Sequence, residues 1–462
     1  MGEKEGKRGS GKMDFSDLSD FYDSGATRSF FARKAALEGL LSGVIRHEEA
    51  LLRAMEEDLG KSRFEGYMTE VGLVRDEIRF QLKHLKKWMH PRRVPTPLTQ
   101  FHAVSCEVPE PYGLVLVMAP WSYPVQLSLE PLAGAIAAGN CVVLKPSNYA
   151  PHTAQVLQSL IEDALPAGWA RVVLGGRQEN EALLDCRFDY IFFTGGRTVG
   201  RLVMEKAAQH LTPVSLELGG KSPVLVLDDA DIPLAARRIV FGKLLNCGQT
   251  CVAPDYVLVQ PGARERLIEA MKQEIRQALG GDPLANPEYP HIVNEKHAQR
   301  LHGLLEHADI LFGGRGDGLK LEPTLVTCSG RDEPVMQEEI FGPILPILTM
   351  DSLSDMIAFV RGDEKPLALY LFTSSKATER RVFDTLSFGG GCVNDTIIHL
   401  ATPHMGFGGV GASGMGAYHG KKSFETFTHF RSVVWKSTWM DLPMRYHPYT
   451  DKKDKLVRFF LH

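Results

Sequence analysis

The sequence has no apolar run of the roughly 18 or more residues that could span a bilayer. Its first residues lack the apolar core of a signal peptide, and Gly6 stands where a myristoylation signal needs Ser or Thr. Its last residues contain no cysteine for prenylation. These absences predict a cytoplasmic protein with no integral membrane segment. The basic and aromatic C-terminus, with Lys455 and Phe459, predicts a solvated tail in preference to one that touches a membrane surface.

A strong charge of one sign is also missing. The formal net charge is −4, so no basic field attracts nucleic acid. The seven cysteines are scattered and odd in number, and they lack the paired spacing of a disulfide framework or a zinc site. We therefore expect a reducing compartment, no bound metal and no nucleic-acid partner. With 462 residues, the chain is long enough for two or three domains.

Hydrophobic periodicity predicts a helical beginning and an alternating middle. Apolar residues recur at helical spacing over residues 33–59, with Gly60 as a stop, and again over residues 71–88. The prolines that follow end helical structure, and the next segment is expected to be extended. Short apolar runs then alternate with helical lengths, at residues 114–118, 141–144, 172–174 and 190–193. Such runs predict strands buried on both faces of a parallel sheet, as in a dinucleotide-binding domain.

A second alternating series predicts a second α/β domain. It begins near Pro223 and has apolar runs at 224–227 and 256–259, so we place a domain boundary at Glu217. The segment from Phe430 to Lys436 is β-prone and far in sequence from both cores. The predicted order is a disordered tail, a nucleotide-binding domain, a second α/β domain and a C-terminal segment, over residues 1–13, 14–216, 217–428 and 429–462.

Two short motifs carry the clearest chemistry. Cys251 ends the turn Asn246-Cys247-Gly248-Gln249-Thr250-Cys251, and Glu217 lies in Leu216-Glu217-Leu218-Gly219-Gly220-Lys221. A thiol and a carboxylate are the two groups needed to form and then hydrolyse a thioester. Taken alone, the cysteine is more typical of a small buried hydrophobe. Taken alone, the glutamate is more typical of a helix cap or a partner of Lys221.

Further blocks surround these two motifs in a fixed order. They are Ala119-Pro120-Trp121-Ser122-Tyr123-Pro124, Leu144-Lys145-Pro146-Ser147, Phe193-Thr194-Gly195-Gly196, Glu338-Glu339-Ile340-Phe341-Gly342-Pro343 and Phe407-Gly408-Gly409-Val410-Gly411. Together with the two motifs, they resemble aldehyde dehydrogenases. The chain is similar to the class 3 branch of that family from about Phe15 to Tyr449.

The resemblance implies an α/β fold with a Rossmann-type cofactor domain, an α/β catalytic domain and a small β bridging element. In that element, residues 430–436 pair with an extended arm near residues 99–112 and join two subunits, so we expect a homodimer. It also implies an enzyme that oxidises small aldehydes to carboxylic acids with NAD or NADP. Cys251 is then the nucleophile and Glu217 the general base. A thiol needs a lowered pKa to react as a thiolate, and we expect a helix N-terminus to lower it.

Ser122 is the main departure from the family pattern. The tetrahedral alkoxide needs fixed donors, of which the backbone N–H of Cys251 is one. In the family, an asparagine amide at the position of Ser122 is the other. A serine hydroxyl is shorter than this amide and less rigidly aimed. Two alternatives therefore stay open: a catalytically impaired nucleotide-binding relative, and a thiol esterase that uses Cys251 without hydride transfer.

The resemblance also assigns the binding residues. For the cofactor they are Lys145, Asn148, Thr194, Gly195, Gly196, Val199, Gly200, Glu339 and Phe341. Asn148 replaces a glutamate that usually contacts the adenosine ribose, and a carboxylate there would repel a 2′-phosphate. The sequence therefore predicts relaxed discrimination against NADP. For an aliphatic or aromatic aldehyde, the expected lining is Tyr123, Phe241, Leu245, Ile398 and Phe407.

Overall fold

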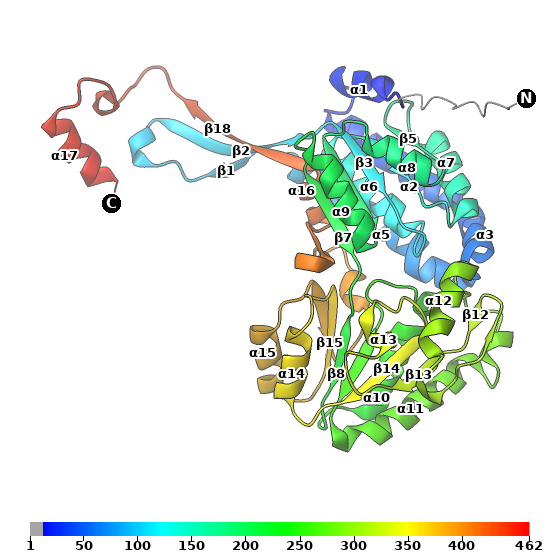
Figure 1. Cartoon of the computed structure of the whole chain (residues 1–462). Coiled ribbons are helices and arrows are strands. Elements are labelled where there is room, and N and C mark those ends of the chain that lie inside the picture. Colours follow the sequence, from blue (N-terminus) through cyan, green and yellow to red (C-terminus); the bar gives the residue numbers. More distant parts are fainter. Residues whose placement is uncertain (1–12, 462) are drawn as a thin grey trace, which may run out of the picture.

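The computed structural model describes residues 13–461. The disordered tail predicted for residues 1–13 lies outside the described residues, apart from Met13. Figure 1 shows two lobes, one above the other, and an arm that projects from the upper lobe. Each lobe is built on one sheet, as strand pairing gives a six-stranded and a seven-stranded sheet.

The chain begins with helices that pack on the first lobe. They are α1 (Ser16–Asp23), α2 (Phe30–Arg46), α3 (Glu48–Leu59), α4 (Arg63–Gly66), the π-turn η1 (Tyr67–Val71) and α5 (Gly72–Trp88). The run predicted over residues 33–59 is thus two helices, which meet at His47. Gly60 ends the second with φ 65°, a left-handed conformation that glycine adopts without steric cost.

The first sheet has the strand order β17-β7-β6-β3-β4-β5. Its strands are β3 (Leu114–Met118), β4 (Cys141–Lys145), β5 (Ala170–Val172), β6 (Tyr190–Gly195), β7 (Val214–Leu218) and β17 (Gly414–Met415). All pairs except β17 with β7 are parallel, and β3 and β4 are buried along their whole length. The predicted parallel sheet is confirmed. The helices of this lobe are α6 (Gln126–Ala138), α7 (Pro151–Ala164), α8 (Arg177–Leu184), α9 (Arg197–Ala208) and α16 (Lys421–Thr426).

The second sheet has the order β10-β13-β14-β9-β8-β15-β16. Its strands are β8 (Pro223–Val226), β9 (Tyr256–Val259), β10 (Asp309–Phe312), β13 (Thr324–Thr327), β14 (Ile344–Thr349), β15 (Ala368–Phe372) and β16 (Gly390–Val393). Its helices are α10 (Ile232–Leu244), α11 (Pro261–Leu279), α12 (Glu295–Leu305), α13 (Pro334–Gln337), α14 (Leu353–Arg361) and α15 (Lys376–Thr385). A small hairpin joins β11 (Gly316–Asp317) to β12 (Lys320–Leu321).

The chain crosses between the lobes beside Glu217. Strand β7 ends at Leu218 in the first sheet, and β8 begins at Pro223 in the second. Later the chain returns, because β17 pairs with β7 and places Gly414 opposite Glu217. Residues 414–428, which the sequence assigns to the second domain, therefore lie against the first sheet. Gly414 is required there, since a Cβ would collide with the carbonyl oxygen of Leu216.

The arm is a three-stranded sheet in the order β1-β2-β18. Strand β1 (Arg92–Val94) pairs with β2 (Ala103–Pro111), and β2 pairs along its whole length with β18 (Thr428–Lys436). The pairing expected between residues 430–436 and the arm near 99–112 is therefore present. Beyond it, the C-terminal tail forms the helix α17 (Asp451–Phe460). Within residues 13–461, no helix combines the length and apolar character needed to cross a bilayer.

Candidate active site

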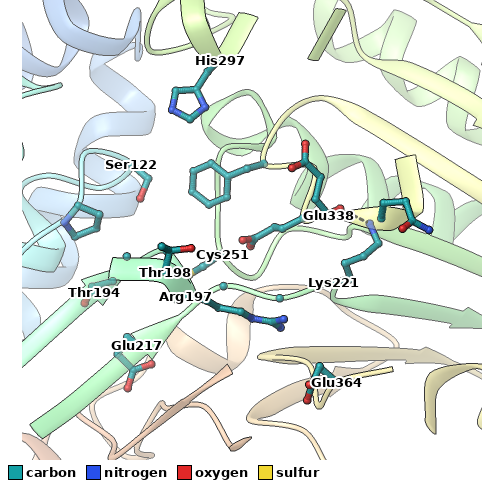
Figure 2. A pocket seen from close by; sticks show the side chains of 18 of the residues that line it. Ser122, Thr194, Arg197, Thr198, Glu217, Lys221, Cys251, His297, Glu338 and Glu364 are labelled. Atoms are coloured by element: carbon teal, nitrogen blue, oxygen red, sulfur yellow. Dashed lines mark hydrogen bonds between the residues drawn. The ribbon is translucent and has the colours of Figure 1, made fainter. Parts of the chain in front are cut away.

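A large cavity of about 750 Å³ lies between the lobes, and residues from both lobes line it. The first lobe contributes Ser122, Thr194 and Glu217, while the second contributes Cys251 and Glu339. Figure 2 shows Ser122, Thr194, Glu217 and Cys251, which come from different elements, around this space. The structure therefore brings together residues that are distant in sequence, and it does so at the crossing point of the chain. We call this space the large cavity.

The turn that carries Cys251 is tightly folded. The 3-10 turn η3 (Leu245–Gly248) has left-handed backbone at Asn246 and Cys247, with φ 50° and 54°. Gly248 is needed next, because a Cβ would collide with the carbonyl oxygen of Gly342. The Gln249 amide then donates to the carbonyl oxygens of Asn246 and His291, at 3.0 Å each. These bonds fix the turn that ends at Cys251.

The expected lowering of the Cys251 pKa is wrong for the protein alone. Burial, together with the carboxylates of Glu339 and Glu217, raises the pKa of Cys251 to about 12, although the backbone N–H groups of Cys251 and Val252 act in the opposite direction. The residues after Cys251 form a turn, so the predicted helix N-terminus is missing there. A thiolate at this position therefore needs a nearby positive charge or a base that removes the proton.

Glu217 is a buried and unpaired carboxyl on β7. Only 3% of the residue is exposed, and neither carboxylate oxygen has a hydrogen-bond partner among the described residues. Burial raises the pKa of Glu217 well above its usual value. Lys221 binds Asp255 and the carbonyl oxygens of Val335 and Glu338. The alternative of a Glu217–Lys221 pair is therefore wrong.

The loop that carries Ser122 is tied to the Cys251 turn. The Asn246 side-chain amide donates to the Ser122 carbonyl oxygen at 2.8 Å, and the Lys61 amine approaches the same oxygen at 3.4 Å. Lys61 also forms a fully buried ion pair with Glu70 at 2.5 Å. The next residue, Tyr123, has its hydroxyl 2.6 Å from the Thr250 hydroxyl. Because of these contacts, Ser122 and Cys251 face the same space.

The glycine-rich turn after β6 meets the expectation of a strand followed by a helix. Gly196 is the N-cap of α9, and a Cβ there would have no neighbour within 4 Å, so the turn has free space beside it. Thr194, Gly195 and Gly196 line the large cavity. Gly200 packs against Leu218 instead, where a Cβ would lie 2.7 Å from a methyl group. Val199 is exposed on α9 and is not part of the lining.

Lys145 and Asn148 lie at the end of β4, outside the lining of the large cavity. The Lys145 amine donates to the carbonyl oxygens of Pro146 and Gly175, both at 2.7 Å, and burial lowers its pKa to about 8. The amide of Asn148 lies next to Gly176. Glu179 caps this loop by accepting the backbone N–H of Gly176 at 2.6 Å. Glu179 is not among the cofactor-binding residues expected from the sequence.

Glu339 and Phe341 line the large cavity from the second lobe. Burial, with a contribution from Asp255, raises the pKa of Glu339 to about 8, and one carboxylate oxygen has no partner among the described residues. The Phe341 ring packs at 82° against Trp121, with ring centres 5.3 Å apart. The neighbouring Glu338 forms a half-exposed ion pair with Arg300 at 2.9 Å.

A second, apolar cavity of about 210 Å³ adjoins the first. All five residues expected to bind the aldehyde line it: Tyr123, Phe241, Leu245, Ile398 and Phe407. Glu217 and Cys251 line this apolar cavity as well as the large one. Met68, Tyr418 and His419 also line it, and the sequence argument missed them because no local motif marks them.

Comparison with known proteins decides what this arrangement is. Residues 22–433 match the model of the aldehyde dehydrogenase family. The chain belongs to the aldehyde dehydrogenase family. It is 46% identical to 4,4'-diaponeurosporen-aldehyde dehydrogenase of Staphylococcus aureus, over 96% of this chain and 98% of the relative. It is 44% identical to aldehyde dehydrogenase family 3 member B1 of Homo sapiens, over 95% of both chains.

The fold leads to the same family. A solved structure described as the substrate-bound state of Staphylococcus aureus AldH matches with a TM-score of 0.94 and 46% identity, over 96% of this chain and 98% of that one. The chain is thus an NAD(P)-dependent aldehyde dehydrogenase similar to class 3 members. The alternatives of an impaired nucleotide-binding relative and of a thiol esterase find no support in these comparisons.

Ser122 gives a first prediction. If its hydroxyl replaces the amide only in part, Ser122→Asn raises kcat/KM for aldehyde by up to about 10²-fold, because the gain exists only in the tetrahedral state. Ser122→Ala lowers the rate further. Steady-state kinetics measure both effects, and the Kd for NAD is the control that stays constant. An unchanged or lower rate in Ser122→Asn contradicts an impaired oxyanion site.

Proposed function

We propose that Cys251 is the nucleophile of this aldehyde dehydrogenase and that Glu217 is its general base. The observation that supports both roles is that these two side chains, from different lobes, line both the large cavity and the apolar cavity. An aldehyde in the apolar cavity and a dinucleotide in the large cavity would then meet at the same thiol. The buried, unpaired state of Glu217 suits a group that exchanges protons during the reaction.

The chain's own groups account for each step. Cys251 attacks the aldehyde carbon, and the Ser122 hydroxyl and the backbone N–H of Cys251 stabilise the oxyanion. When bound, the oxidised nicotinamide ring supplies a hydride acceptor and a positive charge. Glu217 then removes a proton from the water that attacks the thioester, and burial raises the pKa of this carboxyl above its usual value, which makes it a stronger base. The acid leaves and the thiol is restored.

The residues of the large cavity fit a dinucleotide. The free space at Gly196 and the N-terminus of α9 suit a pyrophosphate, which backbone N–H groups bind readily. The unpaired carboxylate oxygen of Glu339 suits a ribose hydroxyl donor. We assign Lys145 and Asn148, at the end of β4, to the adenosine ribose. The apolar lining of the smaller cavity suits an aliphatic or aromatic aldehyde.

Glu217→Gln is the decisive test of the base role. We expect a stoichiometric burst of NADH followed by a steady rate about 10²-fold or more below that of the native enzyme, because thioester hydrolysis loses its base. Stopped-flow absorbance measures both phases.

Cys251→Ala abolishes the burst, whereas Cys247→Ala changes rates by less than a few-fold because Cys247 is fully buried against the Tyr289 hydroxyl. Equal losses in both cysteine variants, or no burst in Glu217→Gln, contradict the assignment.

Cofactor preference gives a separate prediction. Because Asn148 carries no charge, NADP is used with an efficiency within about tenfold of NAD, or roughly 1.4 kcal/mol. Asn148→Glu then restores a preference for NAD, as measured by kcat/KM for each cofactor. Glu179→Gln is the matched control, because it removes the carboxylate that caps this loop in the native enzyme. If the native enzyme rejects NADP and Glu179→Gln relieves the rejection, Glu179 is the discriminating group and the assignment to residue 148 is wrong.

We further propose a homodimer in the cytoplasm, formed through the arm. Strand β18 is an edge strand with one side unpaired, and Val434 and Trp435 on it are half exposed. A long edge of this kind favours pairing with another chain. The six cysteines other than Cys186 are free, as suits a reducing compartment. We expect Trp435→Lys to shift the molecular mass measured by light scattering from that of a dimer to that of a monomer. The same change at Trp439, an exposed residue outside the strand, leaves the mass unchanged. A native monomer contradicts the proposal.

A further inference from the structure

A buried acid–histidine cluster adjoins the apolar cavity but has no role in the steps above. It consists of His419, Glu130 on α6 and Glu77 on α5, each at most 3% exposed. The Nδ1 atom of His419 lies 3.1 Å from a carboxylate oxygen of Glu130. Glu77 accepts the backbone N–H of Gly420 at 2.7 Å. We call these three residues the His419 cluster.

His419 touches two separate spaces. On one side it lines the apolar cavity together with Glu217 and Cys251. On the other side it lines a small cavity with Glu77, Glu130 and the exposed Asp76. Within residues 13–461, His419 is the one ionisable side chain that lines both spaces. The Nε2 atom of His419 has no hydrogen-bond partner among the described residues, although only 3% of the residue is exposed.

The reaction creates a need for such a connection. Oxidation of an aldehyde by NAD⁺ and water yields a carboxylate, NADH and two protons. One proton leaves the attacking water as Glu217 takes it, and the other leaves the carboxylic acid when it ionises. The proton that the Cys251 thiol loses on addition is regained when the acid leaves. Glu217 is 3% exposed and has no hydrogen-bond partner among the described residues, so it must return each proton before it can act again.

We propose that the His419 cluster carries protons from Glu217 to the surface near Asp76. A water molecule in the apolar cavity takes the proton from Glu217 and delivers it to Nε2 of His419. The imidazolium then loses its Nδ1 proton to Glu130, and the small cavity passes that proton to solvent beside Asp76. One proton enters the ring and one leaves it, so the charge of the cluster is restored. This inference rests on the proposed base role of Glu217.

The electrostatics of the cluster suit proton transfer near neutral pH. Burial lowers the pKa of His419, but the charge and hydrogen bond of Glu130, with Glu77, raise it more, so the net direction is upward. Burial and Glu130 raise the pKa of Glu77 to about 7. The other titratable groups that face the ring are Tyr418, which stacks on it, and His399. Burial raises the pKa of Tyr418 and keeps it neutral, and burial lowers that of His399 to about 4.

The backbone also holds the ring in place. His419 has a left-handed conformation with φ 82°, which is uncommon for a residue with a side chain. The ring stacks on Tyr418 with centres 4.2 Å apart, and the backbone N–H of His419 donates to the Ser423 hydroxyl at 2.8 Å. Asparagine tolerates the left-handed region better than most residues. His419→Asn therefore removes the ring while keeping a polar side chain suited to this backbone.

The test compares NADH formation with proton release in the native enzyme and in His419→Asn. Stopped-flow absorbance follows NADH, and a pH indicator dye in weak buffer follows protons. We expect the burst of NADH to keep its rate within twofold, the steady rate to fall by about tenfold or more, and proton release to lag behind NADH. Added imidazole restores the steady rate. His399→Asn is the matched control, a half-buried histidine that lines neither cavity, and it changes each quantity by less than twofold.

A second variant tests the charge. Glu130→Gln keeps the shape of the carboxylate but removes the anion that stabilises the imidazolium. The pKa of His419 then falls, so the acid limb of the kcat profile moves to lower pH.

The proposal is overturned if His419→Asn keeps the native steady rate. It is also overturned if that variant slows burst and steady rate equally without rescue by imidazole, since His419 then only shapes the wall. A failure of the Glu217 assignment appears separately, as an absent burst in Glu217→Gln.

Discussion

The hydrogen bond from the Asn246 amide to the Ser122 carbonyl oxygen spans the two lobes at the turn that ends at Cys251. The Ser122 carbonyl oxygen belongs to the loop after β3, and the Asn246 amide belongs to the turn after α10. The bond therefore requires that the two sheets are correctly placed relative to each other. Lys61 adds a second donor to the same oxygen, and its buried pair with Glu70 holds it there. Removing one member of a buried ion pair typically costs about 3–5 kcal/mol. The loop therefore has little freedom to move away from Cys251.

The local parts of the site were predictable from the sequence. The turns around Glu217, Gly196 and Cys251 depend on glycines and small residues at fixed spacing, and such constraints act between near neighbours. The strands of both sheets were also visible as short apolar runs. The five residues expected around the aldehyde do line one cavity. Their roles stay predictions, because geometry alone does not assign chemistry.

Other parts depend on contacts between distant residues, and the sequence has no local signal for them. Glu77 and Gly420 are 343 positions apart, yet one binds the other. The pairing of β17 with β7 also depends on contacts between residues that are distant in sequence. The same holds for the return of residues 414–428 to the first lobe. The raised pKa of Cys251 also depends on residues that are distant in sequence. The motif shows small residues around the thiol, whereas the folded chain adds two carboxylates and an apolar wall.

The pairing of β17 with β7 has a consequence for how the protein is made. Strand β7 carries Glu217, and its outer edge is completed by residues that are about 200 positions further along the chain. During synthesis, the first lobe leaves the ribosome with that edge open, and it closes only when the last tenth of the chain emerges. The nucleotide-binding half is thus not a unit that matures first. Glu217 thus reaches its final surroundings only when the whole fold is complete, so incomplete chains lack a finished site.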